Sequence, residues 1–202
     1  MEPLLQQASL AVDLVEANRR VPAVVRCDLG AVLKTTLDEA LGGIRLRPWR
    51  LLTLDGTTAV VLAYTRATEL PEPVPPVMLL GMRPVRAGLI LQGLICPMER
   101  STSGGEWPVW CSRPAMTPAE AVAVWTRQRA AVLEVKIAQV EVTMKGRHRT
   151  VRKAQGAWKE FGRLPAVEVR LAVDAASDPM PLLEHGLGRQ KAYGFGCLVA
   201  GP

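Results

Sequence analysis

Apolar and polar side chains alternate along residues 8–15, a pattern that predicts a strand with one buried face. Residues 16–27 interrupt the alternation. From residue 29 to residue 41 apolar side chains recur three or four positions apart, which predicts a helix. Asp28 stands just before this run and can cap the helix, and Gly42-Gly43 can end it. The chain therefore opens with a strand followed by a helix.

Two apolar runs, 44–54 and 57–66, flank the pair Asp55-Gly56. An Asp-Gly pair supplies the positive φ angles of a tight turn, so these runs are predicted to form a hairpin. Four prolines in residues 67–76 exclude a long helix there and predict a stiff, extended connection. Residues 77–85 are a further apolar run, which completes the order strand, helix, strand, strand, linker, strand.

A similar order of elements follows in the second half of the chain. Thr117, Pro118 and Glu120 have the spacing of a capping box with proline at the first helical position. The predicted elements are, in chain order, a strand in 87–98, a polar loop in 99–116, a helix from 117 to about 133, strands in 136–144 and 166–173, a short helix in 180–185 and a last strand in 195–200.

Two successive βαββαβ units fit this order of elements. The sequence therefore predicts an α+β fold with two tandem ferredoxin-like domains. The N-terminal domain is expected in residues 1–87. The C-terminal domain is expected in residues 88–202, where it carries a basic segment and a glycine-rich loop at its end.

Composition limits the possible classes of protein. The chain has 202 residues, 49% of them hydrophobic and 22% charged, which is typical of a globular protein. No apolar run approaches the roughly 18 residues that span a membrane, and the start lacks a basic leader. Four cysteines without a C-x-x-C pair and only two histidines make a disulfide framework or a metal site improbable. We therefore expect a cytoplasmic protein with no metal and no cofactor.

The net charge of +6 arises in one part of the chain. Residues 136–170 contain nine of the 25 basic and three of the 19 acidic side chains, so the remainder carries 16 of each sign. Such a concentrated excess suits a polyanion, although a solvated basic face is the plainer alternative. The candidate RNA-binding residues in this segment are Lys145, Arg147, His148, Arg149, Arg152 and Lys153.

The chain ends in a cationic glycine loop, HGLGRQKAYGFGCLVAGP. A dinucleotide-binding fingerprint needs a helix after the glycines, whereas a strand is predicted here. The stretch KAYGFGCL matches the RNP1 pattern of RNA-recognition motifs only in part. The glycines can expose backbone N–H groups for a phosphate, or they can serve only close packing. The candidate residues for phosphate binding are Gly186, Gly188, Arg189, Lys191, Gly194 and Gly196.

The terminal stretch LLEHGLGRQKAYGFGCLVAGP resembles the C-terminal glycine-rich loop of the CRISPR-associated repeat-processing endoribonucleases, specifically the CasE branch of type I-E Cascade complexes. The helix LGAVLKTTLDEAL, the segment RPVRAGLILQGLICPMER and the helix TPAEAVAVWTRQRA resemble further parts of that family in the same order. The resemblance implies two ferredoxin-like domains that bind a repeat-derived RNA hairpin. It also implies metal-independent cleavage, in which the ribose 2′-OH attacks its own 3′-phosphate and leaves a cyclic phosphate and a 5′-OH.

The first helix departs from the family at two positions. The family has a tyrosine and a catalytic histidine where this chain has Ala31 and Lys34. An imidazole can accept a proton near neutral pH, whereas an ordinary lysine is already protonated there. Lys34, with Arg26 or His185, is therefore expected to stabilise the phosphate or to donate a proton to the leaving oxygen. An exposed helix lysine without a role is the alternative.

The resemblance also implies partners. The chain is expected to be monomeric when free, to bind CRISPR repeat RNA, to hold the 3′ hairpin of the processed RNA and to join other Cascade-type subunits, with no membrane contact. An alternative is a weak or inactive RNA-binding subunit of the same kind of complex, because the usual tyrosine and histidine are replaced. A general RNA-binding ferredoxin-fold protein outside CRISPR is a more distant alternative.

Overall fold

The computed structural model describes residues 4–42, 44, 46, 48–86, 88–100, 104–154 and 157–201, without the side chains of 148–154, 157–163 and 192. These residues form two compact units. The first comprises Met1–Val85, Arg149–Leu164 and Ala192–Gly194, and the second comprises Arg86–His148, Pro165–Lys191 and Phe195–Pro202.

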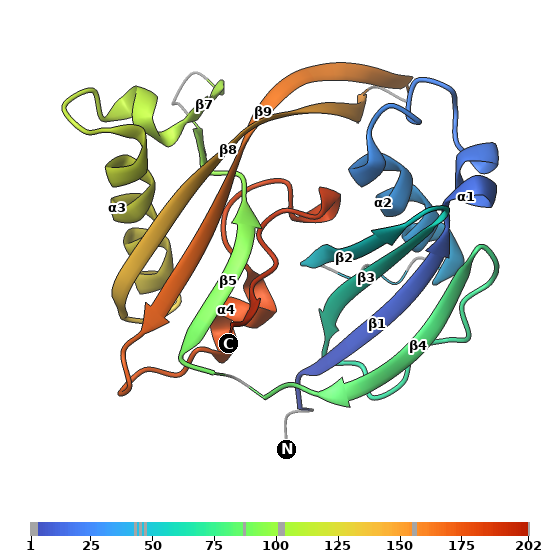
Figure 1. The fold of residues 1–202 in the computed structure, drawn as a ribbon, viewed down its shortest axis with the longest axis horizontal. Helices are drawn as coiled ribbons and strands as arrows, with labels where there is room; N and C mark the ends of the chain where they lie inside the picture. Colours follow the sequence, from blue (N-terminus) through green and yellow to red (C-terminus); the bar gives the residue numbers. More distant parts are fainter. Residues whose placement is uncertain are drawn as a thin grey trace. The chain divides into compact units, whose positions relative to one another are not determined.

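The first unit contains a four-stranded sheet with the strand order β2-β3-β1-β4 (Figure 1). β3 pairs antiparallel with both β1 and β2, and β1 pairs antiparallel with β4. The hairpin between β2 and β3 turns one residue later than predicted, because Asp55 ends β2 and pairs with Thr58. The turn residues are Gly56 and Thr57, and Gly56 supplies the positive φ, 54°. The elements are β1 (Gln6–Asp13), α1 (Leu14–Arg20), α2 (Leu29–Ala40), β2 (Trp49–Asp55), β3 (Thr58–Thr65) and β4 (Val77–Pro84).

The helix α1 lies where the sequence predicted only an interruption. The first strand ends at Asp13 because the Asp13 carboxylate accepts hydrogen bonds from the N–H groups of Val15 and Glu16 and so caps a helix. Glu16 then pairs with Arg20 one turn later, with 3.0 Å between Oε1 and Nε. The prediction of a strand through residue 15 was wrong at this end, because a local cap outweighs the apolar alternation.

The helix α2 begins after Asp28, as predicted. The Asp28 carboxylate accepts a hydrogen bond from the Ala31 N–H at 3.1 Å. The apolar face of α2, including Val32, Leu33 and Leu37, is buried in one core with Leu10 and Val12 of β1. Packing this face against the sheet fixes the direction in which the polar face of α2 points.

The second unit contains a four-stranded sheet with the strand order β10-β5-β9-β8 (Figure 1). β5 pairs antiparallel with β9 and with β10. The elements from residue 90 onward, of which β8, β9 and η2 belong only in part to the second unit, are β5 (Ile90–Ile95), β6 (Met98–Arg100), β7 (Glu106–Pro108), the 3₁₀ helix η1 (Val109–Ser112), α3 (Pro118–Ala131), β8 (Ile137–Ala154), β9 (Ala157–Val173), α4 (Met180–His185), the 3₁₀ helix η2 (Lys191–Tyr193) and β10 (Val199–Ala200).

Two segments of the second half contain more regular structure than the sequence predicted. The basic stretch between the strands predicted in 136–144 and 166–173 continues β8 as far as Ala154 and begins β9 at Ala157. The region read as a polar loop contains the antiparallel pair β6–β7 and η1. Each sheet nevertheless has the strand order of a ferredoxin-like fold, which confirms the predicted fold class.

The terminal glycine loop lies directly against the backbone of the second unit. The Gly196 N–H donates to the Leu94 carbonyl at 2.7 Å, the Leu187 N–H to the Gly196 carbonyl at 2.9 Å, and the Arg189 N–H to the Cys96 carbonyl at 3.2 Å. These donors therefore bind protein carbonyls and are not available to a phosphate. The packing alternative for the glycines accordingly explains at least this part of the loop.

Gly196 and Gly188 are the positions where the close approach requires glycine. Gly196 has a φ of 79°, and a Cβ atom added there would overlap the carbonyl oxygen of Leu187. Gly188 has a φ of 85°, and an added Cβ would lie 2.8 Å from the carbonyl oxygen of Cys96. Both contacts are with main-chain atoms, which cannot rotate away as a side chain can.

We expect Gly196→Ala to lower the free energy of unfolding by about 3 kcal/mol, because backbone strain and a main-chain clash add at that position. The matched control is Gly146→Ala, where φ is 94° but nothing lies within 4 Å of the added Cβ. In the control variant the free energy of unfolding should fall by only about 1 kcal/mol, from backbone strain alone. Urea denaturation measures both variants, and equal losses would show that the close approach contributes nothing.

Candidate nucleic-acid interface

Lys34 lies on the polar face of α2 and is held by an ion pair. Its Nζ is 2.8 Å from Oδ2 of Asp38, one turn further along the helix. The two side chains are 23% and 29% exposed, so the pair is only partly open to solvent. The ammonium group of Lys34 is therefore held in one position by Asp38 and is close enough to the surface to meet an anion.

Arg26 lies in the turn that precedes α2. Its N–H donates to the Ala23 carbonyl at 3.3 Å, and its side chain is exposed. Arg26 and Lys34 belong to the first unit, whereas His185 belongs to the second. The structure thus places two of the three predicted catalytic residues in the same unit. Along the chain, Arg26 precedes Asp28, the residue that caps α2, and Lys34 follows it.

Part of the terminal loop packs in the first unit. Tyr193 is half-buried against the core that α2 and the first sheet form. A Cβ added at Gly30, in the first turn of α2, would lie 2.7 Å from the carbonyl oxygen of Tyr193. Gly194 lies against the ring of Trp49, with an added Cβ 2.8 Å from the nearest ring carbon. The loop backbone thus contacts the N-terminal turn of the helix that carries Lys34.

The two cations of the terminal loop have different surroundings. Arg189 pairs with Glu106 of β7, and its side chain remains 44% exposed. Lys191 is more deeply placed, and its Nζ donates to the carbonyl of His185. Burial lowers the pKa of Lys191 below its ordinary value of 10.5, because removal of water disfavours the charged form. A nearby anion would offset this desolvation.

The first half of the terminal loop also borders a pocket of about 270 Å³ in the second unit. His185, Gly186, Gly188, Arg189 and Lys191 line one side of it. The other side comes from α3, which contributes Trp125 and Arg129, and the chain just after it. The structure therefore brings five of the predicted site residues together, and it adds residues of α3 that the sequence gave no reason to select.

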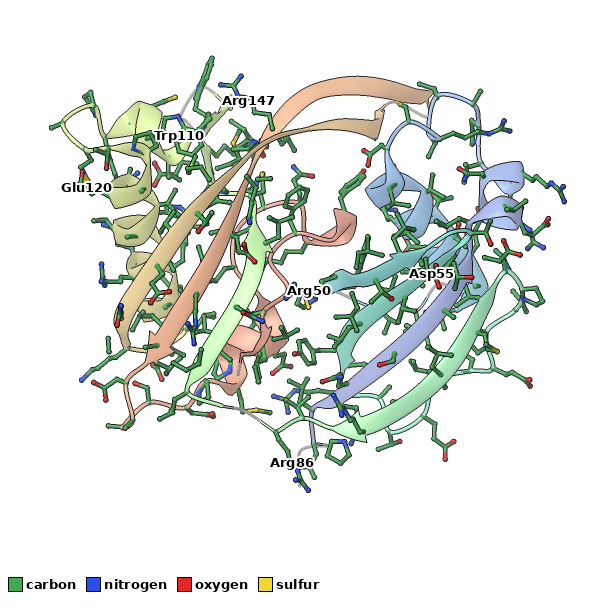
Figure 2. All side chains as sticks on the ribbon, in the orientation of Figure 1. Arg50, Asp55, Arg86, Trp110, Glu120 and Arg147 are labelled. Atoms are coloured by element: carbon green, nitrogen blue, oxygen red, sulfur yellow. The ribbon has the colours of Figure 1, made fainter. Side chains whose placement is uncertain are left out.

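The basic segment is described only in part. Lys145 of β8 pairs with Glu168 of β9 at 2.8 Å, and both side chains are nearly half exposed. Arg147 lies further along β8 and is exposed (Figure 2). The side chains of the remaining predicted residues lie outside the described part of the chain, so their roles stay predictions; they are His148, Arg149, Arg152 and Lys153.

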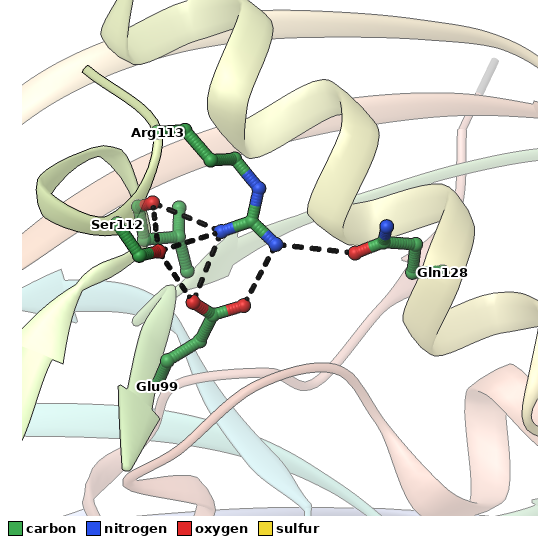
Figure 3. A network of polar contacts seen from close by, with 5 residues as sticks. Glu99, Ser112, Arg113 and Gln128 are labelled. Atoms are coloured by element: carbon green, nitrogen blue, oxygen red, sulfur yellow. Dashed lines mark hydrogen bonds and ion pairs between the residues drawn. The ribbon is translucent and has the colours of Figure 1, made fainter. Parts of the chain in front are cut away.

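A network of polar contacts connects β6, η1 and α3. The guanidinium group of Arg113 binds both carboxylate oxygens of Glu99, at 2.9 and 3.0 Å (Figure 3). It also donates to the Gln128 side chain on α3 at 3.2 Å, and Ser112 donates to Glu99 at 2.7 Å. This two-pronged geometry is the strongest kind of arginine–carboxylate contact. The network therefore fixes the helix that forms one wall of the pocket.

The N-terminus of α3 is fixed separately by the predicted capping box. The Glu120 N–H donates to the Thr117 hydroxyl at 3.3 Å, and the Thr117 N–H donates to the Glu120 carboxylate at 2.8 Å. The Thr117 hydroxyl also donates to the Glu120 carboxylate, at 2.7 Å, and these two bonds from the Thr117 N–H and hydroxyl lower the pKa of Glu120. Glu120 and Trp110 of η1 are labelled in Figure 2.

Among the described residues, no group of three or more His, Cys, Asp and Glu side chains could hold a metal ion. Within the same part of the chain, no helix combines the length and the apolar composition needed to cross a membrane.

No protein-family model matches the sequence, and no curated protein matches it. Solved structures do match. The structure of CRISPR endoribonuclease Cse3 bound to a 19-nucleotide RNA has a TM-score of 0.64 and 22% identity, and the match covers 98% of this chain and 100% of that one. The chain has the fold of Cse3. CRISPR-associated protein Cas6e from Escherichia coli K-12 matches with a TM-score of 0.60 and 15% identity, over 98% of this chain and 99% of that one. A subunit of a CRISPR RNA-guided surveillance complex matches with a TM-score of 0.58 and 16% identity, over 96% of this chain and 97% of that one.

The resemblance found in the sequence is thus confirmed at the level of the fold. Sequence reasoning missed Arg129 and Trp125, and no signal in the sequence could have selected them. They are an ordinary exposed arginine and an ordinary buried tryptophan on α3. Only their position across the pocket from the terminal loop makes them candidates.

The Glu99–Arg113 contact predicts a pH-dependent stability. The hydrogen bond from Arg113 is the main cause that lowers the pKa of Glu99 below its ordinary value of 4.5. Between that lowered pKa and 4.5, the unfolded chain binds more protons than the folded one. The stabilisation is therefore full above about pH 4.5 and is lost as the pH falls through the lowered pKa.

We expect Glu99→Gln to lower the free energy of unfolding at pH 7 by about 2 kcal/mol and to flatten its decrease below about pH 4.5. The control is Glu39→Gln, which changes an exposed glutamate of α2. Chemical denaturation at several pH values measures the effect. A Glu99→Gln profile parallel to that of the unaltered protein would contradict the assignment.

Proposed function

We propose that this protein binds the RNA hairpin of a CRISPR repeat, cleaves the precursor transcript next to that hairpin and stays bound to the product. The observation that carries the proposal is the shared fold with RNA-bound Cse3 over 98% of the chain. The cationic terminal loop and the basic strand β8 supply the charge that such a ligand needs. The likeness to a subunit of a surveillance complex supports a place in a Cascade-type assembly. The substrate would be a cytoplasmic transcript.

In the proposed reaction the ribose 2′-OH attacks the adjacent phosphorus, and the bond to the 5′ oxygen of the next nucleotide breaks. The products are a 2′,3′-cyclic phosphate and a 5′-OH, so the nucleophile comes from the RNA itself. The protein must orient the ribose and phosphate and stabilise the charge that develops on the phosphate oxygens. It must also allow a proton to leave the 2′-OH and another to reach the leaving oxygen.

Lys34 is the proposed stabiliser of this charge. Its ammonium group is partly buried and is already positioned by Asp38. A phosphate oxygen can take the place of the Asp38 carboxylate or share the lysine with it, because an ammonium group has three donors. Arg26, in the turn before the same helix, is proposed to bind the phosphate chain. The catalytic role predicted for His185, which belongs to the second unit, stays a prediction.

A binding-only role is the second candidate, and the Lys34–Asp38 pair is the observation that favours it. The Lys34 Nζ is already engaged as a donor to the Asp38 carboxylate, so the structure does not place it as a base. Without a base, the chain would hold the hairpin of a finished CRISPR RNA but would cleave slowly or not at all.

Single-turnover cleavage of a labelled repeat hairpin in EDTA distinguishes the two candidates. For a cleaving enzyme we expect a cyclic-phosphate product and a Lys34→Ala rate about 100-fold below that of the unaltered protein. Lys136→Ala, which removes an exposed lysine of the second unit, is the control. An unchanged rate in Lys34→Ala would rule out the role of Lys34, and tight binding without cleavage would establish the binding-only candidate.

RNA affinity should depend steeply on salt, because each neutralised phosphate releases counterions. We expect the slope of log affinity against log salt to lie between about −3 and −6. Arg147→Ala should reduce its magnitude by about 1. Lys145→Ala should reduce it less, because Glu168 already pairs with that lysine. Filter binding between 50 and 300 mM salt measures both variants, and a flat profile would refute the proposed interface.

A further inference from the structure

The residues that line the pocket beside the terminal loop are of two chemical kinds, and all of them belong to the second unit. The apolar ones, here called the apolar wall, are Met98, Trp125, Val132, Leu133 and Leu187. The cationic and polar ones, here called the cationic wall, are Arg129, Arg189, Lys191 and His185 with Gly186 and Gly188. Among the described residues, no acidic side chain lines the pocket.

Within the apolar wall, the ring of Trp125 is held in place by contacts with Gly188 and Arg129. Trp125 is only 1% exposed, and the glycine at 188 lets the loop backbone lie on its ring, with an added Cβ 3.2 Å from the nearest ring carbon. The guanidinium carbon of Arg129 lies 5.7 Å from the centre of the Trp125 ring, within the range of a cation–π contact. This contact places the Arg129 guanidinium group beside the Trp125 ring of the apolar wall.

The described contacts of the cationic wall leave hydrogen-bond donors over. Arg189 contacts Glu106 but has further donors, because a guanidinium group carries five N–H bonds. The ammonium group of Lys191 is partly desolvated and donates to a neutral carbonyl. An anion in the pocket would therefore contact several donors at once and would restore some of the solvation that Lys191 has lost.

The size of the pocket limits the ligand. Its volume of about 270 Å³ is just below the range of small-molecule sites, about 300–1,000 Å³. An RNA duplex cannot enter such a space, whereas one nucleotide unit has a suitable size. A nucleotide also has the two required faces, a flat apolar base and an anionic phosphate.

We propose that this pocket holds a single unpaired nucleotide, with the base against the apolar wall of α3 and Met98 and the phosphate against Arg129, Arg189 and Lys191. The nucleotide comes either from a single-stranded extension of a bound hairpin or from a free mononucleotide. The first source rests on the proposed function, whereas the second does not.

The first experiment uses free ligands and the unaltered full-length chain. Isothermal titration calorimetry should show that adenosine 5′-monophosphate binds about tenfold more tightly than ribose 5-phosphate, because only the former has a base for the apolar wall. Equal affinities would overturn the role of that wall.

Two arginines of α3 provide a matched pair of variants. Arg129 lines the pocket, whereas Arg127 is also exposed on α3 but does not. Residues two positions apart on a helix point in different directions. Arg129→Gln should weaken nucleotide binding about tenfold, and Arg127→Gln should leave it unchanged. Equal effects of the two variants would overturn the assignment.

Val132 allows a second test that does not depend on removing a cation. It lines the pocket but is 75% exposed, so substitution there should not prevent folding. A glutamate at this position would place a negative charge beside the proposed phosphate. Val132→Glu should therefore bind the nucleotide about tenfold more weakly than the neutral variant Val132→Gln.

A last experiment measures the affinity of the protein for a blunt repeat hairpin and for the same hairpin with a single-stranded extension. If RNA supplies the nucleotide, the extension should raise affinity, and Arg129→Gln should abolish that gain. Hairpin binding without any gain, together with no binding of adenosine 5′-monophosphate, overturns the pocket assignment and leaves the proposed function standing. Binding of the mononucleotide without binding of the hairpin supports the pocket with a free nucleotide and refutes the proposed function.

Discussion

The arrangement of the second unit depends on the close approach of two main-chain segments, the terminal loop and the strand β5. The N–H of Gly196 bonds the carbonyl of Leu94, and the N–H of Arg189 bonds the carbonyl of Cys96. Side chains at Gly93, Gly188 or Gly196 would fill the space that these bonds need. Backbone packing therefore sets the path of the loop, and the path of the loop sets where Arg189 and Lys191 stand. Their positions do not rely on flexible side-chain contacts.

Several cationic side chains of the candidate interface form ion pairs with carboxylates. Lys34 pairs with Asp38, Arg189 with Glu106 and Lys145 with Glu168. Ion pairs at or near the surface contribute little to stability, about 0–1 kcal/mol when they are exposed, so they position a cation without binding it irreversibly. A phosphate can replace the carboxylate at small cost. Lys191 differs because burial, and not a carboxylate, determines its state.

Helix α3 is fixed at its start by the capping box and near its end by the contact from Arg113 to Gln128. This double attachment explains how a helix with little apolar periodicity holds its position. It buries Trp125 through tertiary contacts and presents Arg129 at the surface. The pocket wall is thus supported by polar contacts around it and by one large aromatic ring within it.

Local signals in the sequence determined much of the first unit and the start of α3. The Asp28 cap and the capping box at Thr117 were predicted correctly, and the first hairpin turn was predicted to within one residue, because each acts through neighbours within a few residues. The order of elements also predicted the ferredoxin-like sheets, because a strand that alternates in polarity must bury one face. The helix α1 was missed because its cap, Asp13, ends an otherwise regular alternation.

The candidate site depended far more on tertiary structure. The sequence determined that the chain ends in a cationic glycine loop, but it left open whether the glycines expose donors or permit packing. Only the fold decided that several donors bind protein carbonyls and that Arg129 of α3 faces the same pocket as Lys191. The physical reason is distance along the chain: about sixty residues separate these two cations, so no local preference can bring them together. Their proximity follows from how a helix and a loop pack on one sheet.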